Sequence, residues 1–382
     1  AIWMGALDDY RKEIDDIDRE LTSLFEKRMN VVLNVAKYKK DNKLEVLQKG
    51  REAEVIQKAV DTLNNKDYSD EVVRFMNATM EISRGLQKRK IQDEEKFKDI
   101  NIERESINKN KKVGFPGVSG AFTEEALIKF FGEECERGAY EEFEDVFIAL
   151  QNREVDYGII PIENSSTGGI SDTYDLLRKY GFYILGEECI RIEQHLVGLE
   201  GSIVEEIDEI YSHPQGIEQS SEFLKQYHHW KLIPFHNTAI SAKLIKDLGD
   251  NTKAAIASKR AADIYGLKVI KECINNQKDN FTRFIVISRE LKVVEEANKV
   301  SVVFSLENEA GTLYRLLRHF AENNINLIKI ESRPMKDTSW RYFLYLDFEG
   351  DIEGKEVKNA LRLIEENSAY FKLLGAYERK TN

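Results

Sequence analysis

The stretch that decides the fold of the middle of the chain is Tyr157-Gly158-Ile159-Ile160-Pro161-Ile162-Glu163-Asn164-Ser165-Ser166-Thr167-Gly168-Gly169-Ile170. Its apolar, β-branched beginning predicts a buried strand. A cluster of side-chain donors and acceptors and two glycines follow, and in an open α/β sheet ligands bind outside the carboxyl ends of strands. A polar turn that only closes the strand is the alternative. Glu163 and Asn164, directly before the hydroxyls, favour a pocket for a small polar acid.

The composition limits the class of protein. The 382 residues suffice for two or three domains, and 42% hydrophobic residues suffice for their cores. A net charge of −12 argues against nucleic-acid binding, no apolar run has membrane-spanning length, and no signal peptide is visible. Cys135, Cys189 and Cys273 are scattered without metal-like spacing. We therefore expect a cytoplasmic protein without a metal, a cofactor, a membrane contact or a nucleic-acid partner.

The front of the chain is predicted to be helical. No Gly or Pro occurs from residue 6 to 49, and apolar residues recur at spacings of three and four. A helix over residues 7–40 would be ~50 Å long, too long for one compact small domain, so we expect a partner chain to share it. Further helices are predicted over residues 46–64 and 69–90. The apolar stripe of the first helix consists of Leu7, Tyr10, Ile14, Ile17, Leu21, Leu24, Val31, Val35 and Tyr38.

Arg28 lies within that apolar stripe, where a guanidinium needs an anionic partner. An internal ion pair, for instance with Glu52, is one interpretation. A bound anion is the other, because more polar residues fall near the same face or on the next two helices. These residues are Lys39, Arg51, Glu52, Ser83 and Gln87. Their convergence in a helical bundle would suit a compact dicarboxylate. Arg11 lies about a quarter turn away from Arg28 around the first helix, which suits the pocket of a partner chain better.

In order and spacing, this set resembles the active site of the all-helical chorismate mutases, over residues 1–98. The resemblance implies the rearrangement of chorismate to prephenate, which needs only a held conformer and stabilised charge on the breaking ether oxygen. It also implies a dimer that exchanges its first helix. The implied carboxylate-binding residues are Arg28, Arg51 and an Arg11 from the other chain. Lys39 and Gln87 would donate to the ether oxygen, and Glu52 would accept from the ring hydroxyl. Ser83 and Gln48 would contact the substrate, and related enzymes can carry Asp at the position of Gln48.

After the front, residues 99–111 are dense in charge and predict a solvated linker. From residue 112 onward, strand-like and helix-like runs alternate, which favours a parallel-rich α/β sheet. Two more polar segments stand out there, and each has an ordinary alternative. Ser212-His213-Pro214 can be a helix cap and turn, and Thr282-Arg283-Phe284 can start a strand.

In combination, these segments resemble a prephenate dehydratase over residues 112–290. The resemblance implies two α/β lobes like those of a solute-binding protein, 112–188 with 269–290 and 189–268, and a site in the cleft between them. The reaction expels the ring hydroxyl as water and the ring carboxylate as carbon dioxide, so it needs a proton donor and a poorly solvating wall. The implied roles are proton donation by Thr282, substrate binding by Asn164, Ser165, Ser212 and Gln219, shaping of the site by Arg283, an apolar face from Phe284, and either an acid or a structural role for Glu163.

The tail, residues 298–376, predicts a βαββαβ order, which is a ferredoxin-like module. Its motifs 309–313 and 331–334 resemble the effector motifs of the ACT domains attached to prephenate dehydratases, with Thr312 where Ala is usual. The resemblance implies inhibition by L-phenylalanine, and a dimerisation module without a ligand is the alternative. The implied effector residues are Gly311, Thr312, Leu313, Glu331, Ser332, Arg333 and Pro334.

The whole chain is thus expected to be a multidomain protein with an all-α mutase domain, a two-lobed α/β dehydratase domain and an α+β regulatory domain. Its expected function is a bifunctional enzyme of L-phenylalanine biosynthesis in the shikimate pathway, a homodimer or homotetramer that acts on chorismate and prephenate. A solute-binding or regulatory protein on a two-lobed fold is the competing hypothesis. A third hypothesis keeps one active domain and one relic.

Overall fold

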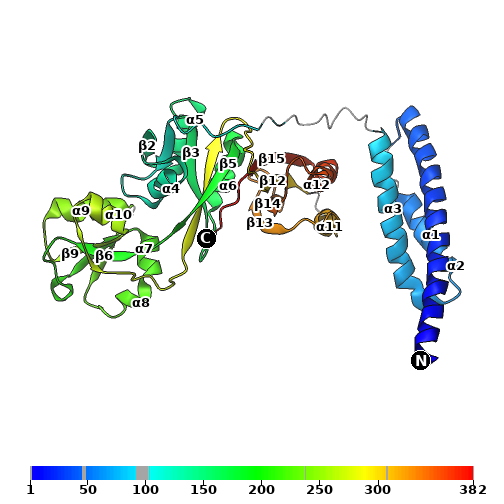
Figure 1. The fold of residues 1–382 in the computed structure, drawn as a ribbon, viewed down its shortest axis with the longest axis horizontal. Coiled ribbons are helices and arrows are strands. Elements are labelled where there is room, and N and C mark those ends of the chain that lie inside the picture. The colour runs from blue at the N-terminus through cyan, green and yellow to red at the C-terminus, as the bar shows by residue number, and fades with distance from the viewer. Residues whose placement is uncertain are drawn as a thin grey trace. The chain divides into compact units, whose positions relative to one another are not determined.

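A computed structural model describes residues 2–44, 49–91, 102, 104–236, 238–306 and 309–381. The chain divides into two compact units, Ala1–Asn101 (unit 1) and Ile102–Asn382 (unit 2), each of which is described by itself (Figure 1). Across the described ranges, no helix combines the length and the apolar character that crossing a membrane requires.

Unit 1 is helical, and its elements are α1 (Ile2–Asp41), α2 (Lys49–Thr62), the 3₁₀ turn η1 (Lys66–Tyr68) and α3 (Ser69–Ile91). The long first helix is confirmed, and α3 packs against both α1 and α2. The buried apolar side chains of the unit are few: Met29, Ala36 and Met80. The whole apolar stripe of α1 predicted from the sequence is exposed, from Leu7, 51% exposed, to Tyr38, 64% exposed. The first helix therefore presents a continuous exposed apolar face within the single chain.

Unit 2 begins with an α/β lobe, lobe A, whose sheet has the order β2-β1-β3-β11-β5, with β4 paired to β3. β1 is parallel to β2 and β3, and β11 is antiparallel to β3 and β5. Helix α4 packs on one face of the sheet and α5 and α6 on the other. The bounds are β1 Val113–Pro116, α4 Phe122–Phe131, β2 Arg137–Tyr140, α5 Phe143–Gln151, β3 Tyr157–Asn164, β4 Gly168–Gly169, α6 Ser171–Tyr180, β5 Tyr183–Arg191 and β11 Phe281–Ser288.

The chain leaves lobe A after β5, builds a second sheet, lobe B, and returns for β11. The order in lobe B is β10-β6-β9-β7-β8, with β7, β8 and β9 parallel. The two-lobed α/β fold is thus confirmed. The bounds are β6 His195–Gly198, η3 Val204–Glu206, β7 Glu209–Ser212, α7 Pro214–Gln219, α8 Ser221–Leu224, β8 Lys231–Pro234, α9 Thr238–Leu248, β9 Lys253–Ala257, α10 Lys259–Ile264 and β10 Lys268–Lys271.

The tail has the predicted βαββαβ order and forms an antiparallel sheet, the tail sheet, ordered β13-β14-β12-β15. The ferredoxin-like module is confirmed. Its elements are β12 Lys299–Ser305, α11 Thr312–Glu322, β13 Leu327–Pro334, β14 Tyr342–Glu349, α12 Lys355–Glu366 and β15 Tyr370–Tyr377.

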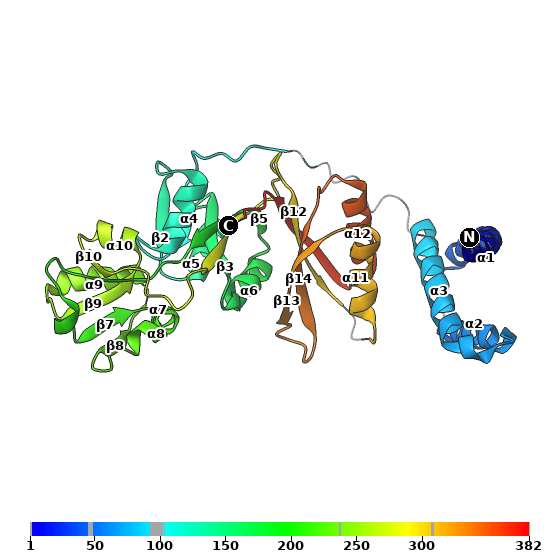
Figure 2. The ribbon, with the colours of Figure 1, turned by 60° about the horizontal axis from the view of Figure 1, so that its bottom comes forward.

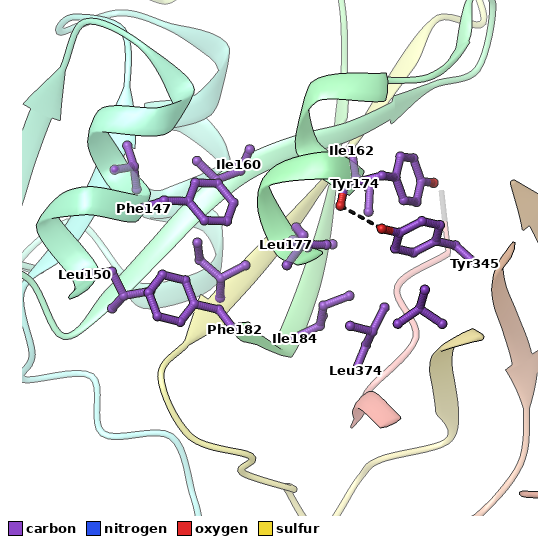
Figure 3. Packing of buried hydrophobic residues seen from close by; sticks show 14 of the residues in the cluster. Phe147, Leu150, Ile160, Ile162, Tyr174, Leu177, Phe182, Ile184, Tyr345 and Leu374 are labelled. Atoms are coloured by element: carbon purple, nitrogen blue, oxygen red, sulfur yellow. Dashed lines mark hydrogen bonds between the residues drawn. The ribbon is translucent and has the colours of Figure 1, made fainter. Parts of the chain in front are cut away.

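Both faces of the tail sheet are covered (Figure 2). Successive side chains of a strand point to opposite faces, and in β12 the even residues pack against α11 and α12, whereas Val303 packs against lobe A. Figure 3 shows the resulting shared core, in which Tyr174 of α6 lies beside Tyr345 of β14 and Tyr345 Oη donates to the Tyr174 carbonyl at 2.9 Å. The close packing extends to main chain, because a methyl group on Gly375 would lie 2.1 Å from the Ile184 carbonyl oxygen. Lobe A and the tail sheet therefore share one hydrophobic core.

Part of the predicted linker also belongs to unit 2. Ile102 and Ile107 pack against the core between the tail sheet and its helices. The Arg104 guanidinium donates to Asp351 at 2.8 Å, to Glu353 at 3.0 Å and to the Glu295 carbonyl at 2.8 Å. Residues 99–111 were predicted to be a solvated linker, and the structure instead places Ile102, Arg104 and Ile107 on the tail module.

Candidate active sites

The predicted site of unit 1 is partly assembled between α1 and α3. Arg28 Nη1 donates to Ser83 Oγ at 2.5 Å, so the cation in the apolar stripe contacts a hydroxyl and not Glu52. Lys39, Ser83 and Gln87 are buried in a unit whose apolar stripe is exposed. Among the described residues, the buried Gln87 Oε1 has no hydrogen-bond partner. Because buried polar atoms are nearly always paired, this arrangement fits a site that receives a polar ligand.

Glu52 has a partner that the sequence interpretation missed. Its Oε1 accepts from Arg84 Nη1, and both side chains are about three-quarters buried. The sequence did carry a signal for this pair, because Arg84 directly follows Ser83 on the helix that packs against α2. Arg84 of α3 therefore holds Glu52 in place, irrespective of the group from which the second carboxylate oxygen of Glu52 accepts.

Two predicted cations stay at the surface of the single chain. Arg11 pairs with Asp8 at 3.3 Å and Arg51 with Glu54 at 3.0 Å, each within its own helix, with arginine side chains 66% and 59% exposed. Exposed pairs of this kind contribute little stability and leave the guanidinium available. The predicted residue Gln48 lies outside the described residues.

In lobe A, strand pairing brings the predicted dehydratase residues together. Thr282 is directly opposite Asn164, and Arg283 is opposite Glu163. Asn164 Nδ2 donates to Thr282 Oγ1 at 3.0 Å. The orientation of the Asn164 amide follows from Oδ1, which accepts from the backbone N–H of Ser166 at 2.9 Å and from the Ser166 hydroxyl at 2.6 Å.

A cleft of about 190 Å³ lies where lobe A, helix α7 of lobe B and the returning chain meet. Ser166 links the Asn164–Thr282 pair to this cleft. Its hydroxyl donates to Asn164 Oδ1 and also lies 3.3 Å from Oδ1 of Asn280, which lines the cleft. Gln219, predicted to bind substrate, lines the cleft and accepts from Gln194 Nε2 at 3.2 Å. The lining residues that the sequence interpretation did not assign are Ser166, Thr167, Gln215, Glu218, Asn275, Asn276, Gln277 and Asn280. The run of amides at 275–277, shortly before Thr282, was a readable signal for them.

Of the predicted dehydratase residues, Gln219 alone is among those that line this cleft. The others do not line it: Glu163, Asn164, Ser165, Ser212, Thr282, Arg283 and Phe284. Ser165 Oγ accepts from the Phe281 backbone at 2.9 Å and so joins the loop to β11. Ser212 is completely buried, its hydroxyl donates to the His213 carbonyl at 3.0 Å, and Gly216 packs directly on it. Phe284 belongs to the core of lobe A under α4. These last three residues shape the site from beneath.

The histidines serve as acceptors for main-chain N–H groups. His213 Nδ1 accepts from Gln215 N at 3.1 Å and caps α7, which agrees with the cap-and-turn alternative. His195 Nδ1 accepts from Cys273 N at 3.0 Å. Burial lowers the pKa of both rings, and this keeps the accepting nitrogens unprotonated. Within the described ranges, no group of His, Cys, Asp and Glu side chains is arranged to hold a metal ion.

Glu163 and Arg283 point away from the cleft. A bulge in the β3–β11 pairing sets Phe284 opposite Pro161 but Arg283 opposite Glu163, and bulges re-aim side chains in this way. Glu163 therefore faces the tail sheet, where it contacts Arg283 Nε and Lys329 Nζ at 3.0 Å each. Burial would raise the pKa of Glu163, but these two cations lower it below its usual value. An ionised Glu163 on this face favours the structural alternative over the acid.

The two predicted effector motifs lie at the start of α11 and on β13. Gly311 has a φ of +80° and caps α11, close to the Arg315 guanidinium, and Leu313 is 40% exposed. On β13, Arg333 donates to both carboxylate oxygens of Asp175 in α6, at 3.0 and 2.8 Å. Glu331 lies against Gly169, where an added methyl group would come within 2.7 Å of its carboxylate.

The same three regions match known families. Residues 10–88 match the chorismate mutase type II family, residues 113–292 the prephenate dehydratase family, and residues 300–365 the ACT domain family. A prephenate dehydratase from Arthrobacter aurescens, solved in complex with L-Phe, is 31% identical with a TM-score of 0.64, over 70% of this chain and 90% of that chain.

Some relatives match this chain along nearly its whole length. A bifunctional chorismate mutase/prephenate dehydratase from Aquifex aeolicus is 31% identical over 98% of this chain and 99% of its own length. The Escherichia coli protein of the same name is 28% identical over 96% of this chain and 95% of its own length. The chain therefore belongs to the family of bifunctional chorismate mutase/prephenate dehydratases.

Proposed function

We propose that the chain converts chorismate to prephenate in unit 1 and prephenate to phenylpyruvate in the cleft of unit 2. The observation that carries this is a match to a bifunctional relative along nearly the whole length of both chains, with both family regions present. The proposed domains are residues 1–98 for the mutase, 112–290 for the dehydratase and 298–376 for the regulatory module.

In the mutase step, no proton is exchanged with the protein and the substrate only rearranges. Catalysis then consists of holding the reactive conformer and placing donors where charge develops. Arg28, with Ser83 beside it, would bind a carboxylate. Lys39 and Gln87 would donate to the ether oxygen, and Arg84 would hold Glu52 for the ring hydroxyl. Arg51 and Gln48 would add further substrate contacts.

In the dehydratase step, Thr282 would donate the proton. Its oxygen accepts from Asn164, so the threonine O–H proton remains available for another acceptor. The departing ring hydroxyl of prephenate takes a proton and leaves as water. The ring carboxylate leaves as carbon dioxide, and the electron pair of the broken C–C bond completes the aromatic ring. Gln219, Ser166 and the amides of residues 275–277 would bind the substrate, with Ser165, Ser212, Arg283 and Phe284 supporting the loop and strand beneath.

L-phenylalanine would inhibit the dehydratase through the tail. The Arthrobacter structure was solved with L-Phe, and the open N–H groups at the start of α11 suit a carboxylate. The residues proposed to form this effector site are Gly311, Thr312, Leu313, Glu331, Ser332, Arg333 and Pro334. An effector can act only if it prefers one arrangement of the protein over another.

We propose a homodimer as the smallest active form. The exposed stripe on the 40-residue helix α1 needs a cover, and a second copy of the same helix offers a matching apolar face. Such a dimer would bring Arg11 of one copy to the pocket of the other. The free thiols Cys135, Cys189 and Cys273 suit the reducing cytoplasm.

Product analysis after incubation with chorismate, with and without L-phenylalanine, tests the function. We expect prephenate first and phenylpyruvate next, with less phenylpyruvate when L-phenylalanine is present. Binding of amino acids without turnover of either substrate would instead favour the solute-binding or regulatory alternative. Turnover of only one substrate would indicate that the other domain is a relic.

A further inference from the structure

Six charged side chains form a closed ring between lobe A and the tail sheet. Three come from neighbouring strands of lobe A and three from neighbouring strands of the tail sheet, and cations alternate with anions around the ring. We call this group the charge ring. Its members, in order of contact, are Glu163, Lys329, Asp347, Lys299, Glu187 and Arg283.

The contacts of the charge ring are short and continuous. Lys329 Nζ lies 3.0 Å from Glu163 and 3.5 Å from Asp347. Lys299 Nζ lies 3.6 Å from Asp347 and 2.6 Å from Glu187. Arg283 contacts Glu187 and closes the ring at 3.0 Å from Glu163. With three cations and three anions, the ring has no net charge.

The charge ring is fully buried at Lys299 and Glu187 and partly buried at Glu163, Arg283 and Lys329. The side chains of Lys299 and Glu187 are 1% and 0% exposed, and that of Lys329 is 16% exposed. Burial alone would lower the pKa of Lys329, but Asp347, Tyr174 and Glu163 raise it. A buried ion that loses its partner is strongly unfavourable, and displacing Lys329 would therefore displace Glu163 as well.

Two ring members are covalent neighbours of the catalytic pair. Glu163 precedes Asn164, Arg283 follows Thr282, and the four residues face one another as two cross-strand pairs. A shift of Glu163 by a fraction of an ångström is transmitted through one peptide unit to Asn164. The Asn164–Thr282 hydrogen bond, on the opposite face of the same strands, would then change.

We propose that Lys329 of the tail sheet is a positioning residue for the dehydratase site and sets the Asn164–Thr282 pair through Glu163 and Arg283. This rests on the proposed placement of the dehydratase reaction at that pair. Lys329 shares β13 with the effector motif 331–334 and points to the same face as Glu331 and Arg333, which contact Gly169 and Asp175. A shift of β13 on effector binding would therefore reach lobe A at three points: Glu163 of β3, Gly169 of β4 and Asp175 of α6.

The test combines Lys329→Met with Asp347→Asn in the full-length chain. The pair removes one charge of each sign, so the ring stays neutral while Glu163 loses its tail partner. We expect the dehydratase kcat to fall ~10- to 100-fold, the scale of a misplacement of about 1 Å, with a smaller change in KM. The mutase activity of the same preparation should be unchanged. Unchanged dehydratase kcat in the folded variant would overturn the proposal.

Lys372→Met is the matched control. Lys372 also reaches from the tail sheet to lobe A, where its Nζ donates to the Gly181 carbonyl at 2.7 Å, but it lies outside the charge ring. We expect a lower melting temperature with wild-type dehydratase kcat and KM. An equal loss of kcat in this control would show that any weakening of the interface reduces activity, and it would also overturn the proposal.

Lys329→Arg decides the question if the double variant does not fold. It keeps the charge and changes the shape of the head group, so we expect a near wild-type melting temperature and a kcat between those of the wild type and a Lys329 variant without charge. Wild-type kcat in this variant contradicts a positioning role. Thr282→Val separates the two proposals. Full dehydratase activity in Thr282→Val means that the reaction has been placed at the wrong site. Loss of activity in Thr282→Val together with normal activity in Lys329→Arg means that only the role of Lys329 is wrong.

Discussion

The segments at the two ends of the chain solve the same packing problem in different ways. Helix α1 of unit 1 leaves its apolar stripe uncovered and buries polar side chains such as Lys39 and Gln87. The tail sheet covers both of its faces within its own chain, one with α11 and α12 and the other with lobe A. The mutase region therefore leaves an apolar face that the proposed second copy would cover, whereas the regulatory region is covered by the dehydratase lobe. A module that looks separable in sequence can be part of its neighbour's core.

Deleting each end in turn gives the largest expected difference. Removing residues 298–382 exposes the shared core and leaves the buried Glu187 without Lys299. Each large apolar side chain of lobe A that loses its cover costs about 1.5–3 kcal/mol, and we expect the melting temperature of the remaining lobes to fall by ~10 °C or more. Removing residues 1–101 should change the melting temperature of unit 2 by at most ~2 °C. Calorimetry of both deletions checks this, and equal losses would refute the comparison.

Arg28→Ala should separate the two activities. Loss of a charged contact that acts mainly in the transition state lowers turnover ~100-fold or more. We expect this loss for chorismate, with no change in dehydratase activity on supplied prephenate, because Arg28 belongs to unit 1. Steady-state assays on both substrates measure it. A parallel fall of both activities would mean that the variant is misfolded or that the sites are not independent.

Mixing two inactive variants tests whether unit 1 needs a second copy. Arg11→Ala and Arg28→Ala proteins, combined under conditions of verified subunit exchange, should recover about a quarter of wild-type mutase activity, because half of the dimers are mixed and each mixed dimer has one intact pocket. A mixture of Arg51→Ala and Arg28→Ala is the control, since both residues are expected in the same chain's pocket. If the first mixture stays inactive, Arg11 acts in its own chain or not at all.

Acid should weaken the contact between the tail and lobe A. Burial raises the pKa of Glu163 and Asp347, but Lys329 and the other cations lower both below their ordinary values of 4.5 and 3.8. Carboxylates of this kind stabilise the fold above their ordinary pKa and lose that contribution as the pH falls through the folded value. We expect unit 2 to lose stability below about pH 4.5, by on the order of 1 kcal/mol per unit of lowered pKa. Thermal unfolding from pH 7 to 3 should show a smaller loss in Glu163→Gln/Lys329→Met.

Much of the fold and part of the site follow from local pattern. The helical period of the front, the strand before Glu163 and the βαββαβ order of the tail were predicted because each element's period is written in consecutive residues. Asn164 and Thr282 were singled out in two separate motifs, but only the pairing of β3 with β11 shows that they lie opposite each other. The amides at 275–277 were visible in the sequence, but their place in the cleft depends on where the chain crosses between the lobes.

By itself, the sequence determined which residue types alternate along each strand, and only the tertiary structure decided what those alternating faces meet. Lys299, Ser301 and Asp347 form a polar face of the kind that normally faces water, and lobe A buries it. A single bulge turns Glu163 from the core of lobe A toward Lys329. The turn after β3 directs the Ser166 hydroxyl, not that of Ser165, to the cleft. Each of these outcomes depends on contacts between residues far apart in the chain, and no local period records them.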